Sequence, residues 1–580
     1  MMRTNVQRSL QSPPISRRSA LKAGLELGIA AAEFPHLLLA SKGESTAQTV
    51  VETASGKIRG RVTDRVAWFK GVPYGGPTSG ANRFQPPSKP QPWTGVRDAD
   101  ELGPRCVQPV RIMVPEMSDA LTGHGPMSED CLTLNVWTAD ARRRSKRPVM
   151  VWFHGGGFRT GWSGSALYDG TALARKHGVV VVSVNHRLNL FGFLYLAGQP
   201  HFETANAGLL DLVLALEWVR ENIAGFGGDP GNVTIFGQSG GGGKVSNLLA
   251  MPRAKGLFHR AIVQSTISET ALWGLAPEEA NKVTETLLAR LGLKKDRLGE
   301  LQKLSTEQLL EAMNGSAGKG GGGSAETDRS AAGANSSAGS VAGDLSLRFV
   351  PVVDGTVLPA NPFDPVAPEV SAGIPLMVGS VETEAVPYTA PNDAYWTTDT
   401  ISDEMLRARV KRALGVENPE ADRIIGIYKK NRLKASNMDL AMIVASDAGG
   451  LRTAGYTIAE HKAAQAKAPV YLYQFQWFSP VRQGRVRCMH GVELPFVFDH
   501  VDLAQWMIGT GPERQGIADQ VSGAWAAFAH SGNPNHRGLP EWRPFSASTR
   551  STLVFDRESA CLNDPHREER LALAALHRPA

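Results

Sequence analysis

Long apolar runs and a strong excess of one charge are both missing from this chain of 580 residues. No stretch approaches the ~18 consecutive apolar residues that cross a bilayer, so we predict no membrane span. The formal net charge is +6, and the first 47 residues hold six Lys/Arg against three Asp/Glu. The remaining 56 basic and 53 acidic residues leave a net charge of +3. So mild and scattered a balance does not indicate a nucleic-acid partner.

Motifs for metals and nucleotides are missing as well. No pair of His or Cys has metal-ligand spacing, no Gly-Lys-Ser/Thr follows a glycine-rich turn, and there is no dinucleotide fingerprint. We therefore predict no metal and no other cofactor. His154 is expected to be a structural hydrogen-bonding residue, and four further histidines are expected to be surface or core residues: His124, His186, His500 and His530.

The N-terminal segment is typical of a targeting signal. Ser16–Lys22 contains paired arginines, as twin-arginine export signals do, with Ala20 where that motif prefers Phe. A weakly apolar stretch, interrupted by two glutamates, runs from Ala23 to Ala40, and Ser45–Ala47 offers a small-x-small cleavage site. We predict that residues 1–47 direct export to the periplasm or the exterior. The alternative is a disordered basic tail on a cytoplasmic protein.

Residues 48–580 are predicted to form one folded domain. Three short strands punctuated by glycines come first, and apolar β-branched runs then alternate with helical periods such as Leu209–Phe226. Val179–Val182 is apolar on both faces, as a strand covered by helices on each side should be. This alternation predicts a mainly parallel, doubly wound sheet. The expected strands are Thr49–Ala54, Lys57–Val62, Val66–Tyr74, Val149–Phe153, Val179–Val184, Val233–Phe236, Ala261–Gln264, Pro375–Val378, Val470–Gln476 and Thr552–Phe555.

Residues 314–344 differ in composition from the segments around them. They consist largely of Gly, Ser and Ala, including four consecutive glycines at Gly320–Gly323. Such a segment cannot bury enough surface to order itself, so we predict a flexible surface insertion. A functional lid is the alternative.

Gly237–Gly241 has the pattern G-x-S-x-G directly after an expected strand. A sharp strand-to-helix turn exposes the serine there, Ser239, and the flanking glycines relieve the clash that side chains would cause. Glycines continue to Gly243, although each costs about 1 kcal/mol in a helix interior. That cost indicates close backbone approach, whereas the alternative is a plain structural turn.

A second glycine loop, Gly155–Gly157, follows the expected strand that ends at Phe153. Backbone amides in such a loop can point at a developing oxyanion, and losing one such donor costs ~10²–10³ in rate. Two glycine loops, each at the end of a parallel-type strand, favour a nucleophilic serine over a structural turn.

Further segments give the chain a resemblance to the type-B carboxylesterases, which include bacterial esterases, some fungal lipases and the cholinesterases. The resemblance extends from about Val50 to Arg570. It implies an α/β-hydrolase fold with N-terminal antiparallel strands and large helical insertions, and hydrolysis of small-molecule carboxylic esters through an acyl-serine. The matching segments, all in the family's order, are Phe69–Tyr74, Ser128–Val136, Asn206–Leu209, Phe226–Pro230, Gly532–Asn535 and Asn563–Pro565.

The resemblance also implies particular site residues. The family's nucleophile motif matches Ser239, and its histidine motif H-G-x-E-L-P-F matches His490. Its oxyanion donors match the amides of Gly156, Gly157 and Gly240. A serine hydroxyl becomes a good nucleophile when an imidazole takes its proton and a buried carboxylate orients that imidazole.

The acid loop departs from the family pattern. The family's G-x-x-x-D-E-G matches Gly379–Ala385, which places the acid at Glu384 in the order Ser…Glu…His. Because both neighbours of that glutamate differ from the family's usual Asp and Gly, Glu382 is a rival. Ser265 matches a family serine that supports the acid.

Three more positions differ from the family pattern. Gln238 stands where Glu is usual and Gly240 where Ala is common, and neither change removes a catalytic group. Lys244 occupies a position that is usually small and polar. We expect its ammonium to extend to solvent, and a buried ion pair is the alternative.

The chain has four cysteines. The resemblance implies a disulfide between Cys106 and Cys131 that closes a short loop. Such a bond persists only in an oxidising compartment, so it agrees with the predicted export. The pairing of Cys488 with Cys561 is left open, and in a cytoplasmic protein the alternative is four buried thiols.

Two other functions remain as alternatives. One is hydrolysis of amides, carbamates or polyesters by the same triad, because specificity depends on the acyl and alcohol pockets rather than on the fold. The other is a non-catalytic, cholinesterase-like binding protein, although such proteins usually lack the serine or the histidine. No motif specifies an oligomeric state.

Overall fold

A computed structural model describes residues 47–109, 123, 125–196, 205–314, 347–386 and 400–576. The predicted export signal at 1–47 lies outside the described residues except for Ala47, and the predicted insertion at 314–344 does so except for Asn314. His124 is also outside them. The boundaries of these segments therefore stay predictions.

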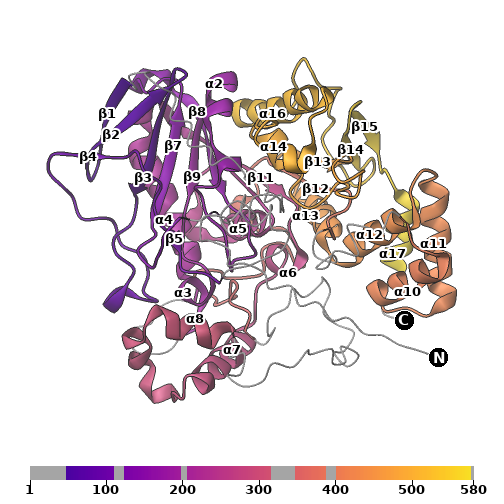
Figure 1. The fold of residues 1–580 in the computed structure, drawn as a ribbon, viewed down its shortest axis with the longest axis horizontal. Coiled ribbons are helices and arrows are strands. Elements are labelled where there is room, and N and C mark those ends of the chain that lie inside the picture. The colour runs from indigo at the N-terminus through magenta and orange to yellow at the C-terminus, as the bar shows by residue number, and fades with distance from the viewer. Residues whose placement is uncertain are drawn as a thin grey trace, which may run out of the picture. The chain divides into compact units, whose positions relative to one another are not determined.

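The described strands form one large mixed sheet of 13 strands (Figure 1). They are β1 (Ala47–Thr53), β2 (Gly56–Thr63), β3 (Val66–Pro73), β4 (Val96–Asp98), β7 (Thr133–Thr138), β8 (Arg147–Phe153), β9 (Val180–Val184), β10 (Gly228–Gln238), β11 (Arg260–Gln264), β12 (Leu376–Val381), β13 (Val470–Phe475), β14 (Ser551–Phe555) and β15 (Ala560–Asn563). Two further short strands, β5 (Arg105–Cys106) and β6 (Met127–Ser128), pair with each other.

The strand order is β1-β2-β3-β7-β9-β8-β10-β11-β12-β13-β14-β15, with β4 beside β2. Pairing is antiparallel from β1 to β9 and parallel from β9 through β14, and β15 closes the sheet antiparallel to β14. The predicted α/β-hydrolase fold, with a mostly parallel sheet and N-terminal antiparallel strands, is confirmed.

The central strands are buried on both faces because their successive side chains point to opposite sides of the sheet. In β8, Val149, Val151 and Phe153 belong to one hydrophobic core, and Met150 and Trp152 belong to a second core. Helices on the two faces complete these cores, which explains why the strand sequences show no polar alternation.

The sheet is covered by α-helices, and short 3₁₀ helices join some of the elements. The α-helices are α2 (Thr171–His177), α3 (Asn189–Phe193), α4 (Ala207–Asn222), α5 (Gly240–Ala250), α6 (Ser268–Ala271), α7 (Pro277–Arg290), α8 (Thr306–Asn314), α10 (Asp403–Leu414), α11 (Asn418–Asn431), α12 (Asn437–Ala448), α13 (Leu451–Ala464), α14 (Leu494–Val497), α15 (Gln505–Ile508), α16 (Glu513–Ser531) and α17 (Arg567–Leu576). The 3₁₀ helices are η1 (Gly80–Asn82), η2 (Arg143–Ser145), η3 (Ala166–Tyr168), η4 (Ile223–Phe226), η5 (Pro252–Ala254), η6 (Lys295–Lys303) and η7 (Glu369–Ser371).

Helices α4 and α5 contribute to the first core, and α2 and α16 contribute to the second, so the sheet is covered on both faces. The predicted helix Leu209–Phe226 corresponds to α4 followed directly by η4. Helices α10, α11, α12 and α17 lie together at the right of Figure 1, and the first three form an insertion between β12 and β13. No helix in the described ranges is long and apolar enough to cross a membrane.

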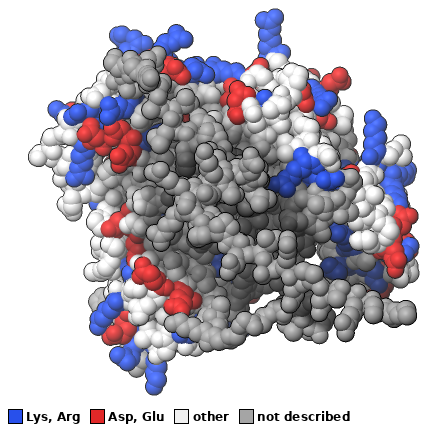
Figure 2. All heavy atoms as spheres, in the orientation of Figure 1, with Lys and Arg blue, Asp and Glu red and all other residues white. Residues whose placement is uncertain are grey.

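Charged side chains of both signs lie close together on the face that Figure 2 shows. The ion pairs of the described residues include Lys176, whose ammonium lies 2.7 Å from a carboxylate oxygen of Asp499. Pairs of this kind at the surface contribute little to stability. The described part of this face has no patch of a single sign.

Candidate active site

Ser239 lies on the turn that joins β10 to α5. Its backbone has φ 60° and ψ −126°, a conformation that non-glycine residues rarely adopt and that surrounding structure must hold in place. Its amide donates to the carbonyl of Gln264 in the next strand at 2.8 Å, and its carbonyl accepts from Gly243 at 3.1 Å. Both sequence neighbours are buried, whereas Ser239 is partly exposed. The turn therefore presents this serine to solvent.

The glycines around Ser239 allow close backbone approach, as the sequence indicates. A methyl group at Gly241 would lie 2.0 Å from the carbonyl oxygen of Phe153, and one at Gly240 would lie 2.6 Å from the amide nitrogen of Gly157. Helix α5 can therefore begin directly against the second glycine loop only because it lacks side chains there.

The loop Gly155–Gly157 lies beside the serine turn. A methyl group at Gly155 would lie 3.3 Å from the Cβ of Ser239. The backbone has φ 98° at Gly156 and φ 62° at Gly157, and both values belong to the region that favours glycine. The structure thus brings two of the three predicted oxyanion donors, Gly157 and Gly240, into contact.

His490 and Glu384 are in direct contact through Nδ1 of the imidazole and Oε2 of the carboxylate. Both side chains are buried. The segment before His490 lies along the acid loop, because Thr383 donates its amide to the Cys488 carbonyl at 3.1 Å and His490 donates its own to Val386 at 2.9 Å. With its Nδ1 hydrogen directed to Glu384, a neutral His490 has its lone pair on Nε2.

Glu382, the rival for the acid position, has different partners. It pairs with Arg432, and its other oxygen accepts from Gln474 at 2.8 Å. Burial alone would raise the pKa of Glu382, but the charges of Arg432 and Arg452 outweigh burial and lower it to about 2. Of the two glutamates, Glu384 contacts the histidine.

Gln238 contacts the second ring nitrogen of the candidate base, His490. Its side-chain nitrogen lies 3.1 Å from Nε2 of His490, at the position of the lone pair. The amide nitrogen of Gln238 is a neutral donor, so this contact adds no charge beside the imidazole. The sequence identified the substitution of Gln for the family's Glu, but it did not reveal the contact.

Glu493 is a second buried carboxyl group in the site, and the sequence reasoning missed it. The hydroxyl of Ser265 donates to its Oε1 at 3.3 Å, so the support expected from Ser265 is directed to Glu493. Its Oε2 has no hydrogen-bond partner among the described residues. Burial and then the charge of Glu384 raise the pKa of Glu493 to about 7. The sequence could have indicated Glu493, because it is the glutamate of the H-G-x-E-L-P-F motif.

The prediction that Lys244 extends to solvent is wrong. Every residue of α5 is buried, so the helix offers its lysine no route to water. Nζ of Lys244 donates to the carbonyl of His154 at 2.8 Å. Its pKa is lowered by burial alone, and among the described residues it has no ion pair, so the alternative of a buried pair does not apply either.

The four cysteines are free thiols in the structure, which therefore does not show the predicted disulfide. Cys106 and Cys131 are nevertheless adjacent. Their hydrogen bond, and then burial, hold the pKa of the Cys131 thiol well above its usual value. Cys488 is buried and donates to the carbonyl of Phe475 at 3.0 Å, whereas Cys561 is partly exposed on β15.

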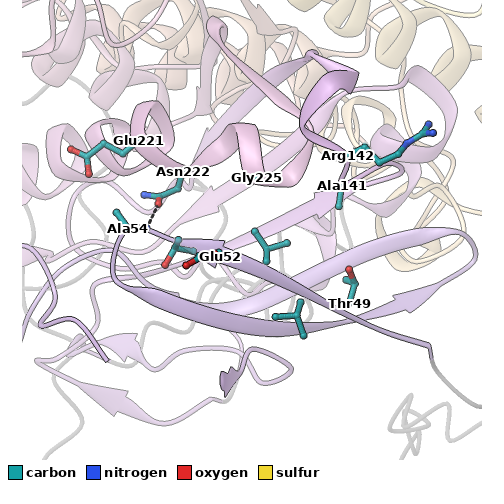
Figure 3. Close-up of a pocket in the computed structure, with 11 residues that line it drawn as sticks. Thr49, Glu52, Ala54, Ala141, Arg142, Glu221, Asn222 and Gly225 are labelled. Atoms are coloured by element: carbon teal, nitrogen blue, oxygen red, sulfur yellow. Dashed lines mark hydrogen bonds between the residues drawn. The ribbon is translucent and has the colours of Figure 1, made fainter. Parts of the chain in front are cut away.

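A surface groove of about 650 Å³ lies between β1 and the end of α4 (Figure 3). Its lining includes Thr49, Arg142 and Glu221, and the side chain of Asn222 accepts from the Ala54 amide at 2.7 Å. It contains none of the site residues described above. Within the described ranges, no group of three or more His, Cys, Asp or Glu residues could hold a metal ion.

The serine, glutamate and histidine of the site each follow a strand of the sheet, in the order found in α/β-hydrolases. The serine turn follows β10, the glutamate follows β12, and the histidine follows β13. The chain belongs to the carboxylesterase family, whose model matches residues 47–574. It is a carboxylic ester hydrolase.

Known proteins similar to this chain include bacterial esterases. The para-nitrobenzyl esterase of Bacillus subtilis (strain 168) is 35% identical over 526 residues, which cover 90% of this chain and 98% of that protein. A solved structure of PNB esterase has a TM-score of 0.73 at 33% identity and covers 92% of this chain and 100% of its own. An esterase from Clostridium hathewayi, described as able to hydrolyse aliphatic aromatic polyesters, has a TM-score of 0.73 at 30% identity, with 91% of this chain and 98% of its own covered.

Proposed function

We propose that the chain hydrolyses esters through an acyl-enzyme in which Ser239 is the nucleophile, His490 the base and Glu384 the orienting acid. The contact between His490 Nδ1 and the buried Glu384 carboxylate is the main support for this proposal. The partly exposed serine on its strained turn is the second support.

In the first half of the reaction, Nε2 of His490 takes the hydroxyl proton of Ser239 while Oγ attacks the ester carbonyl carbon. Glu384 stabilises the imidazolium that forms. The amides of Gly156, Gly157 and Gly240 donate to the tetrahedral oxyanion. The imidazolium then gives its proton to the leaving alkoxide, and the alcohol departs from the acyl-serine.

In the second half, water attacks the acyl-serine and gives a proton to His490. The new tetrahedral species breaks to release the carboxylic acid, and the proton returns to Ser239. The side-chain nitrogen of Gln238 lies at Nε2 of His490. It must move away from Nε2 in each turnover so that the serine hydroxyl can donate its proton there. No other group is needed for atoms and charges to balance.

The proposed substrates are small-molecule esters. The similarity to para-nitrobenzyl esterase supports benzyl esters, and the similarity to the Clostridium hathewayi esterase supports polyesters as the second candidate. Initial rates on p-nitrophenyl esters of increasing chain length, an anilide and a soluble polyester separate these candidates. Faster turnover of the anilide would contradict ester specificity.

Export of the mature protein, with a disulfide between Cys106 and Cys131, is part of the proposal. The twin-arginine-like segment supports export, and the adjacency of the two thiols supports the disulfide. Closing a loop of this size should add roughly 3 kcal/mol in the chain-entropy model. Non-reducing peptide mapping of protein from the periplasm tests both parts, and finding two free thiols there would contradict them.

The nucleophile is tested by Ser239→Ala. Ester hydrolysis should fall roughly 10⁴- to 10⁶-fold, because the triad residues act as a unit and His490→Ala should cost a comparable amount. A fluorophosphonate probe should label the native protein on Ser239 alone, as read by peptide mass spectrometry. Labelling at another serine, or activity that survives in the variant, would overturn the mechanism.

A further inference from the structure

Lys244 is a buried lysine that the mechanism above does not use. It lies on α5 one helical turn beyond Gly240, so both residues lie on the same face of the helix. Its side chain is fully buried, and no carboxylate of the described residues forms an ion pair with it. Burial lowers its pKa to about 7. Lysines are rarely buried in this way unless they are paired, so a specific contact must offset the cost.

The contacts of Lys244 are with the two ends of the oxyanion loop. Nζ donates to the carbonyl of His154, directly before Gly155, at 2.8 Å. Nζ also lies 5.3 Å from the centre of the Phe158 ring, directly after Gly157, where an ammonium is attracted to the aromatic face. One side chain thus holds both flanks of a three-glycine loop.

This loop needs such support because the backbone directly after it, at Phe158, is strained. Gly156, Gly157 and Phe158 all have positive φ, with values of 98°, 62° and 61°. For a bulky residue such as Phe158 this conformation is an outlier that persists only where the surroundings hold it. The ring of Phe158 packs edge-on against Phe193 at 5.3 Å, and Lys244 lies against the ring as a second support.

Two histidines near Lys244, His154 and His186, are neutral. The rings of His154 and His186 stack at 4.9 Å. Burial, and then the charge of Lys244, hold the pKa of each histidine well below its usual value, so both are neutral. Of these three side chains, Lys244 is therefore the one that carries a positive charge below pH 7.

We propose that Lys244 is a positioning residue for ester hydrolysis, which fixes the Gly156 and Gly157 amides opposite the Gly240 amide for the tetrahedral oxyanion. It acts through the His154 carbonyl and the Phe158 ring and does not touch the substrate. The inference rests on the proposed function, because it requires an oxyanion at this loop. It also gives a reason for a lysine at a position that is usually small in the family.

The test compares Lys244→Met with a matched control, Lys462→Met. Lys462 is also buried and donates to backbone carbonyls, those of Ser371 and Ala372, at 2.6 and 2.8 Å. Those carbonyls precede the start of β12, at the opposite end of the strand from Glu384. Both variants thus lose a buried ammonium, but only one loses contact with the loop.

Lys244→Met should lower kcat about 10- to 100-fold and leave KM unchanged, since a loop out of place costs somewhat less than a deleted oxyanion donor. A trifluoromethyl ketone, which adds to the serine hydroxyl to form a tetrahedral hemiketal, should lose affinity by the same factor as kcat. Lys462→Met should keep both the wild-type kcat and the wild-type inhibitor affinity.

A wild-type kcat in Lys244→Met, a change confined to KM, or an equal loss in Lys462→Met would overturn the inference. Thermal melting checks that each variant folds, and Lys244→Gln replaces Lys244→Met under the same criteria if the methionine variant does not fold. Ser239→Ala is assayed in parallel. If that variant remains active, the proposed function has failed, whereas an inactive Ser239→Ala with a fully active Lys244→Met refutes only the role of the lysine.

Discussion

Glu493 is the residue beside the candidate triad with the clearest dependence on pH. Its pKa is raised from 4.5 to about 7 in the folded protein, first by burial and then by the Glu384 charge. Below pH 4.5 both the folded and the unfolded chains hold this proton. Between pH 4.5 and 7 the unfolded chain releases the proton and the folded chain retains it, so folding stability falls as pH rises through that window. Above pH 7 Glu493 is ionised in both the folded and the unfolded chain, so the loss of folding stability that it causes is constant.

Glu493→Gln should remove this penalty. The variant should be more stable than wild type by at most about 3 kcal/mol at pH 8, and equally stable near pH 4.5. Urea denaturation at both pH values measures the difference. Glu404→Gln, at an exposed position on α10, is the control and should change stability at neither pH. An equal gain at both pH values for Glu493→Gln would show that the effect is not electrostatic.

Short motifs in the sequence predicted individual site residues. They could not predict the burial or the contacts of a side chain where these depend on segments far apart in the chain. Ser239 and the glycine loops follow from local patterns next to expected strands, and His490 follows from its match to a motif of the family that the chain resembles. The burial of Lys244 depends on α5 being covered on every side, and the contact between Gln238 and His490 joins positions 252 residues apart. The choice between Glu382 and Glu384 likewise depended on Arg432, which lies directly after α11 in a segment without a recognisable motif.

At the scale of elements, seven of the predicted strands were apolar β-branched runs, and the first three were short strands punctuated by glycines. Each of the ten overlaps an observed strand. Strand β10 begins earlier than predicted because Gly228 pairs with Arg147 of β8, across a break in register that a propensity argument cannot locate. Strand β7 was not predicted as a strand, although it joins the antiparallel and parallel halves of the sheet through β3 and β9.

The close packing of α5 against the oxyanion loop predicts the effect of one methyl group. In Gly241→Ala, the new Cβ would lie 2.0 Å from the carbonyl oxygen of Phe153, just before the loop, so the start of α5 must shift relative to the loop. The kcat should fall about 10- to 100-fold, because small misplacements of reacting groups are costly. Gly516→Ala on α16, where nothing lies within 4 Å of the new Cβ, is the control and should keep full activity. A fully active Gly241→Ala would mean that α5 and the loop adjust without cost.

At the scale of the whole molecule, a buried ionic cluster joins three distant segments. Arg432, directly after α11, pairs with Glu382 at the end of β12 and with Glu569 of α17, where the second pair measures 2.8 Å. All three side chains are at most 9% exposed. Removing one partner of a buried pair leaves an uncompensated charge, which is strongly destabilising.

Because Glu382 belongs to this cluster and Glu384 contacts His490, substitutions at the two glutamates should have different effects. Glu382→Gln should reduce the free energy of unfolding by about 3–5 kcal/mol and leave kcat near the wild-type value. Glu384→Gln should lower kcat by roughly 10⁴, because the imidazolium loses its stabilising charge, with little change in melting. Denaturation curves and initial rates on both variants provide the comparison. The reverse pattern would identify Glu382 as the triad acid.

The same cluster has a consequence for anyone who shortens the polypeptide. Glu569 belongs to the last described helix, yet through Arg432 it is linked to the segment that leads, two residues later, to Glu384. A protease cut before α17 would leave the guanidinium with one carboxylate in place of two. Limited digestion at this terminus should therefore appear first as a lower melting temperature, and a fusion partner added after the helix is safer than one that replaces it.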